Sequence, residues 1–139
     1  MIKLMESGAG SLSTTHAADA YSTMRKLITC AMEAGPHVTM ELAATKLADT
    51  IDFIVQMTCE IVTTPLGRRK VRRVAEILAV EPGEENKRYS LTSIFRAVPG
   101  GIGVADTPPP GRILDQLVAH GFDYTAFLAE ADAHPRRQP

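Results

Sequence analysis

Apolar residues recur every three to four positions in four stretches of the chain, the spacing that places them on one face of an α-helix. Residues suited to helix ends flank three of these stretches. Asp19 or Ala18 begins the first helix, and Thr39 caps the second. Gly121 is suited to end the third in the left-handed conformation. The spacing therefore predicts helices over 17–33, 39–50, 111–120 and 123–133.

A second pattern, with β-branched residues and alternation every two positions, predicts strands. Residues 53–62 begin as a continuous apolar run, which predicts a first half buried on both faces. Turn-forming residues separate this stretch from 71–80 and from 89–96, so we expect an antiparallel meander of three strands. A shorter stretch, 11–15, predicts one more strand ahead of the first helix.

The domain organisation follows from where these patterns stop. Glycine and proline crowd residues 98–110, which predicts a mobile linker. We therefore expect an α/β core over 1–97, this linker, and a helical tail over 111–139. The mildly helical start, Met1–Glu6, is expected to be the last turn of a helix that begins further upstream.

The composition is that of a soluble globular protein with one hydrophobic core: 139 residues, 45% hydrophobic and 22% charged. The net charge of −1 gives no overall attraction to nucleic acid or to anionic lipid. The sequence shows neither an apolar run long enough for a membrane span nor a signal-peptide pattern.

The cysteines and histidines do not form a metal-binding pattern. Cys30 and Cys59 stand singly in apolar surroundings, which predicts reduced core residues of a cytosolic protein. The four histidines have no metal-ligand spacing with either cysteine, so we predict no metal site.

Hydroxyl side chains and one imidazole stand where the first predicted strand meets the first helix. Ser13, Thr14, Thr15 and His16 could bind phosphate oxygens or a polarised water there, because such junctions hold ligands in open α/β sheets. The alternative is structural: Ser13 to Thr15 cap the following helix, and His16 is a surface residue.

Five basic residues lie within six positions, from Arg68 to Arg73. They could bind nucleic acid or an acidic lipid surface. No aromatic residues are interleaved for stacking on bases, so we favour a solvated hairpin tip that runs into a strand.

Several motifs, in one collinear order, resemble a known family. Gly10–Ala17 resembles the histidine box of the secretion ATPase superfamily, in particular the CpaF-type ATPases of tight-adherence pili. Lys26-Leu27 falls where that family has Arg-Leu. Residues 51–56 resemble its Leu-Asp-Leu-Ile-Val-Gln strand, and 72–77 its Arg-Arg-Val strand. Residues 111–123 are similar to its closing stretch.

The resemblance implies the C-terminal half of a RecA-like ATPase core. The complete motor would hydrolyse ATP with Mg²⁺ as a hexamer and power type II or type IV secretion or pilus assembly. It would be cytoplasmic and peripheral to the cytoplasmic membrane, against inner-membrane secretion platform proteins. His16 would sense the nucleotide phosphates, with Ser13, Thr14 and Thr15 as polar supports. Lys26 would make a structural or an intersubunit contact.

The chain lacks the Gly-x-x-x-x-Gly-Lys-Ser/Thr sequence that cradles phosphates, which the family carries upstream of the histidine box. We therefore expect a fragment or a truncated copy that binds neither ATP nor Mg²⁺ by itself. A second hypothesis is a catalytically inactive assembly or regulatory module that docks on intact ATPase subunits. A third, nucleic-acid binding through residues 68–73, conflicts with the net charge near zero.

Overall fold

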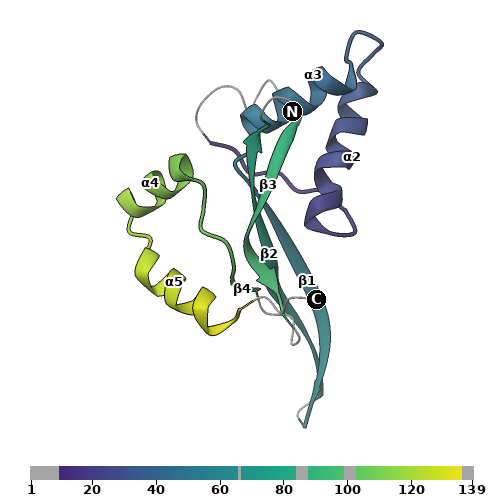
Figure 1. Ribbon diagram of the computed structural model, residues 1–139. Helices are drawn as coiled ribbons and strands as arrows, with labels where there is room; N and C mark the ends of the chain where they lie inside the picture. The colour runs from purple at the N-terminus through teal and green to yellow at the C-terminus, as the bar shows by residue number, and fades with distance from the viewer. Residues whose placement is uncertain (1–9, 66, 84–87, 99–102, 136–139) are drawn as a thin grey trace. The chain divides into compact units, whose positions relative to one another are not determined.

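The computed structural model describes residues 10–65, 67–83, 88–98 and 103–135 (Figure 1). Helices and strands alternate in blocks, as predicted for a mixed α/β chain. The helices are α2 (Ala20–Met32), α3 (Met40–Thr50), α4 (Gly111–Ala119) and α5 (Tyr124–Ala133). The strands are β1 (Phe53–Thr64), β2 (Gly67–Pro82), β3 (Tyr89–Ala97) and β4 (Gly103–Ala105). The start of the chain, for which a helical turn was predicted, lies outside the described residues.

The strands form a four-stranded antiparallel sheet in the order β1-β2-β3-β4. The predicted meander of three strands is therefore confirmed. The fourth strand lies inside the stretch for which a mobile linker was predicted. There Phe95 of β3 is paired with Ala105 of β4, and Ala97 with Gly103. Part of that stretch is thus held in the sheet by main-chain hydrogen bonds.

The chain divides into two compact units, each described here by itself. The first consists of Met1–Ile54 with Leu78–Leu91, and the second of Val55–Ile77 with Thr92–Pro139. Strands β1 and β2 each contribute residues to both units, so neither unit is one continuous segment of the chain.

The core of the first unit forms where α2 packs against α3. Met24, Leu47, Leu78 and Val80 are its largest fully buried side chains. Local capping sets where both helices begin. Asp19 accepts a hydrogen bond from the backbone N–H of Ser22 (2.6 Å), and Thr39 accepts one from Leu42 (3.2 Å). Both predicted helix starts are confirmed, because N-cap residues act within a few positions of themselves.

The second unit has an aromatic core centred on Phe127 of α5, the helix that packs against β4. The ring of Phe127 meets that of Phe95 edge to face, with centroids 5.4 Å apart, and that of Phe122 at 5.7 Å. Nearby, Arg96 Nε lies 3.3 Å from Asp106 Oδ1, and a guanidinium N–H of Arg96 donates to the carbonyl of His134. These contacts fix the C-terminal helix on the sheet.

Three predictions from the sequence are wrong. Residues 11–15 form no strand, and the chain is irregular up to the start of α2. Cys30 and Cys59 are free but exposed, so they are not core residues. The first half of β1 is not buried on both faces: Ile54 is buried, whereas Phe53 and Val55 on the opposite face are exposed. Strand β1 is the first in the sheet order, and only one of its faces contributes to the core.

Gly103 of β4 approaches a neighbouring backbone closely. A Cβ added there would lie 3.0 Å from the carbonyl oxygen of Ala75 and 3.3 Å from that of Val74. We expect Gly103→Ala to lower the free energy of unfolding by about 1–3 kcal/mol, because a backbone carbonyl cannot rotate aside as a side chain can.

The matched control is Gly111→Ala at the start of α4, where an added Cβ meets nothing within 4 Å. It should leave stability unchanged or raise it by up to about 1 kcal/mol, because alanine favours helices. Urea titrations followed by circular dichroism measure both variants. Equal stability of the two variants would contradict the close approach at Gly103.

Candidate functional site

The residues that resemble a histidine box form an exposed, irregular loop, which we call the histidine loop (residues 10–17). Its only large apolar side chain, Leu12, is 97% exposed. Ser13, Thr14, Thr15 and His16 are all exposed as well. The hydroxyl and imidazole groups are therefore displayed on the surface together. The sequence had predicted that these groups lie at the end of a sheet strand, and that prediction is wrong.

The loop is tied to helix α2 by one long side chain. Lys26, in the middle of that helix, donates a hydrogen bond from Nζ to the backbone carbonyl of His16. Lys26 binds the backbone carbonyl of His16 and not its imidazole, and the side chain of His16 is exposed. Two parts of the family resemblance that lie ten residues apart in sequence are thus in direct contact.

The structural alternative for the loop is only partly supported. The side chain that caps α2 is Asp19, which forms a reciprocal capping box with Ser22. Ser13 to Thr15 precede this cap and do not serve as the N-cap residue. His16 is indeed a surface residue, as that alternative proposed. The hydroxyls are therefore not needed to begin the helix.

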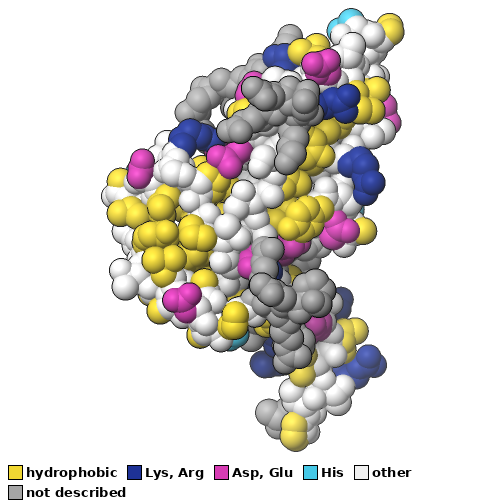
Figure 2. Space-filling model, viewed as in Figure 1, with side chains coloured by type: hydrophobic (Ala, Val, Ile, Leu, Met, Phe, Trp, Pro, Cys, Tyr) yellow, Lys and Arg dark blue, Asp and Glu magenta, His cyan; other side chains and the backbone are white. Residues whose placement is uncertain are grey.

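The basic stretch forms the end of the β1–β2 hairpin, as predicted. Arg68, Arg69, Lys70 and Arg72 are exposed, and Figure 2 shows Lys and Arg side chains over this hairpin. Arg73 is different, because its guanidinium lies 3.3 Å from Glu60 on the neighbouring strand. The hairpin therefore carries four exposed cations and one cation in an ion pair.

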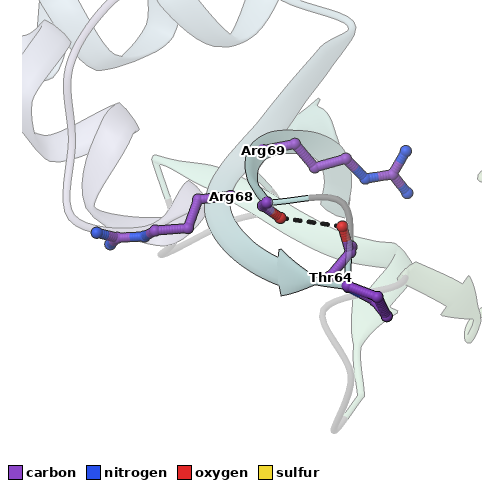
Figure 3. Close-up of a pocket in the computed structure, with 5 residues that line it drawn as sticks. Thr64, Arg68 and Arg69 are labelled. Carbon is purple, nitrogen blue, oxygen red and sulfur yellow. Dashed lines mark hydrogen bonds between the residues drawn. The ribbon is translucent and has the colours of Figure 1, made fainter.

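A surface hollow of about 460 Å³ lies at the turn of this hairpin. Its lining includes Thr64, whose hydroxyl donates to the carbonyl of Gly67 at 2.9 Å, and Gly67 itself has a positive φ of 115°. Figure 3 shows that the side chains of Arg68 and Arg69 point in opposite directions, as those of neighbouring strand residues do. Two diverging guanidinium groups cannot converge on one phosphate, so we do not consider this hollow a nucleotide site.

An exposed apolar stripe on β1 is the feature that sequence reasoning missed. Val55, Met57 and Ile61 alternate along one face of this strand, and Met57 and Ile61 are more than half exposed. The ion pair between Glu60 and Arg73 identifies the opposite face of the hairpin, since residues on one face of a strand alternate with those on the other. The alternation in the second half of this stretch is the pattern of an edge or emerging strand, whereas the apolar run of its first half had been interpreted as a sign of burial.

Three further findings concern possible metal ligands, possible membrane-spanning helices and similarity to known proteins. Among the described residues, no three His, Cys, Asp or Glu side chains are grouped so that they could hold a metal ion. Within the same part of the chain, no helix has the length and apolar character needed to cross a membrane. Comparison with protein-family models, with curated proteins and with solved structures found no match.

Proposed function

We propose that this chain is the C-terminal part of a secretion or pilus-assembly ATPase of the CpaF type, in which His16 senses the nucleotide phosphates. The observation that carries the proposal is the exposed histidine loop, held by Lys26 through the carbonyl of His16. That contact joins two motifs of the family resemblance. It also leaves the imidazole free to donate a hydrogen bond to a phosphate oxygen.

The chemistry of the loop suits phosphate better than metal. Ser13, Thr14 and Thr15 offer hydroxyl donors, and His16 offers a ring N–H. Nothing in the described residues provides a cluster of carboxylates for Mg²⁺. ATP and Mg²⁺ would therefore be held mainly by a P-loop outside this chain's own motifs, while the histidine loop would report on the phosphates.

The setting of the complete motor follows from the same proposal. The subunit would act in a hexamer on the cytoplasmic side of the membrane, against inner-membrane secretion platform proteins. It would power type II or type IV secretion or tight-adherence pilus assembly. The isolated chain would not hydrolyse ATP, because no lysine-bearing phosphate cradle is present in its sequence.

The decisive experiment joins the P-loop half of a CpaF-type ATPase upstream of Gly10. We expect this chimera to hydrolyse ATP, and His16→Ala to lower its kcat about 10- to 100-fold with little change in the Kd for nucleotide. A hydrogen bond to a charged group contributes about 1.5–3 kcal/mol, and here it would form mainly in the closed state. His37→Ala, which removes another exposed histidine, is the matched control and should leave kcat unchanged.

Three results would contradict this role for His16. Parallel losses of binding and turnover would make His16 a ground-state or structural residue. No change in either quantity would make it an ordinary surface histidine. A folded chimera that binds nucleotide without any turnover would show that this chain does not complete the catalytic core.

A second function, a catalytically inactive assembly or regulatory module on intact ATPase subunits, is favoured by one observation. Strand β1 is at the end of the sheet order and exposes Val55, Met57 and Ile61. An open strand edge with apolar side chains is suited to pairing with another chain. The inactive but folded chimera described above is the outcome that this second function predicts.

A further inference from the structure

Charge is strongly segregated within the second unit, although the whole chain carries a net charge of only −1. The stretch Val55–Ile77, which we call the basic hairpin, has five Lys or Arg against two Glu, a net charge of +3. The stretch Gly111–Ala133, which we call the acidic tail, has four Asp or Glu against one Arg, a net charge of −3. Two surfaces of opposite charge are therefore present on one molecule.

The basic hairpin combines cations with exposed apolar side chains. Within the described part of the chain, Arg68, Lys70 and Arg72 are exposed and make no ion pair. The Glu60–Arg73 pair defines one face of the hairpin, so Lys70 and Arg72 belong to the opposite face with Met57 and Ile61. That face therefore presents apolar contact area beside two cations.

The acidic tail has the complementary arrangement on both of its helices. On α4, Asp115 is three residues before the exposed Val118, and on α5 Asp132 is four residues after the exposed Leu128. These spacings place each acid beside its apolar neighbour on one helix face. Figure 2 shows hydrophobic side chains gathered over the region of α4 and α5, with acidic side chains near them. Asp115 and Asp132 make no ion pair among the described residues.

We propose that the basic hairpin of one copy of this chain docks on the acidic tail of a second copy. Opposite charges meet across such a contact, and exposed apolar side chains are covered on both sides. Pairing two hairpins with each other would instead bring like charges together, which is unfavourable. Because the two surfaces differ, the contact is head-to-tail, and a pair of copies keeps one unused hairpin on one copy and one unused tail on the other. Such contacts build closed rings or open chains of subunits.

This inference concerns association alone and does not depend on the nucleotide role of His16. A head-to-tail contact is compatible with the hexamer of the proposed function, so the surfaces would serve that assembly. The test of the docking contact measures the mass of the complex and does not measure ATP turnover. Failure of the docking contact would therefore leave the chimera experiment unaffected, and the reverse is also true.

The test uses the purified chain and two charge-reversed variants. The hairpin variant carries Arg68→Glu with Lys70→Glu, and the tail variant carries Asp115→Lys with Asp132→Lys. We expect wild-type mass in analytical ultracentrifugation to rise with protein concentration at low salt and to fall as salt screens the charges. Each variant alone should associate at least about tenfold more weakly, because like charges then face each other.

The sharpest result comes from mixing the two variants. The tail variant keeps the native hairpin and the hairpin variant keeps the native tail, so these two surfaces remain complementary, and the two reversed surfaces are complementary as well. The mixture should therefore associate with a Kd within about threefold of the wild-type value. Recovery in the mixture also shows that both variants are folded. Arg25→Glu, a reversed cation on the exposed side of α2, is the control and should associate like the wild type.

Several outcomes would overturn the proposal. One is a wild-type chain that remains monomeric up to about 100 µM, where even weak contacts are populated. Another is association that neither variant weakens, as pairing through the β1 edge alone would give. A mixture that fails to recover would equally exclude the contact. A monomeric wild type that binds vesicles of anionic lipid, with binding lost in the hairpin variant, would assign the hairpin to a membrane surface instead.

Discussion

Phe127→Ala should lower the free energy of unfolding by about 3–5 kcal/mol, the largest loss expected for this protein. Phe127 is 3% exposed and is the shared member of three aromatic contacts. Its removal leaves a cavity that the neighbouring rings cannot fill, because their backbone positions are held by β3 for Phe95, by the turn before α5 for Phe122 and by the first turn of α5 for Tyr124. The helical tail should therefore lose its main attachment to the sheet.

The control for this variant is the next residue in the helix. Leu128 is 38% exposed, and Leu128→Ala should cost less than about 1 kcal/mol, as surface substitutions do. Because the chain has no tryptophan, the unfolding of both variants is best followed by circular dichroism during a urea titration. Equal losses for the two variants would show that Phe127 is not the anchor of the tail.

Leu47→Ala should lower the free energy of unfolding by about 2–5 kcal/mol through the other core. Leu47 lies on α3, is 1% exposed, and belongs to the cluster that joins this helix to α2 and β2. The same substitution at Leu42, which is 42% exposed on the same helix, removes the same atoms from a surface position. Both substitutions change helix propensity in the same way. The difference between their losses of unfolding free energy therefore measures the contribution of burial.

Urea titrations of Leu47→Ala and Phe127→Ala also test whether the two units unfold together. If the protein unfolds in one step, both Leu47→Ala and Phe127→Ala should move the whole transition. Two separate transitions, each sensitive to one variant, would show that the units unfold independently. A loss at Leu42 as large as that at Leu47 would contradict the assignment of Leu47 to the core.

The position of the histidine loop limits what this chain can do by itself. His16 and the hydroxyls before it are exposed on irregular backbone, and Lys26 donates a hydrogen bond to the carbonyl of His16. A surface loop of this kind can complete a ligand site that another element provides. It does not exclude water or surround a phosphate, which nucleotide hydrolysis requires. This exposure is compatible with the sensing role proposed above for His16.

The sequence by itself determined the features of this protein that depend on neighbouring residues. The starts of α2 and α3 follow from Asp19 and Thr39, because an N-cap side chain bonds to a backbone N–H three residues away. Gly121 ends α4 with a positive φ of 91°, as expected of a glycine at that position. The hairpin tip with its exposed cations was predictable for the same reason, since turn residues act locally. The exposed His16 was likewise one of the two readings of the sequence.

Only the tertiary structure decided what depends on a partner distant in sequence. Residues 11–15 have strand-like composition but no neighbouring strand, and a strand is stable only when its main-chain groups are paired. The three residues of β4 have no strand pattern of their own, yet β3 supplies the pairing they need. The exposure of Cys59 and of Met57 was decided in the same way, because the period of a strand shows that two faces exist but not which face the core covers. The contact between Lys26 and His16 spans ten residues and links helix to loop, so no local pattern could have predicted it.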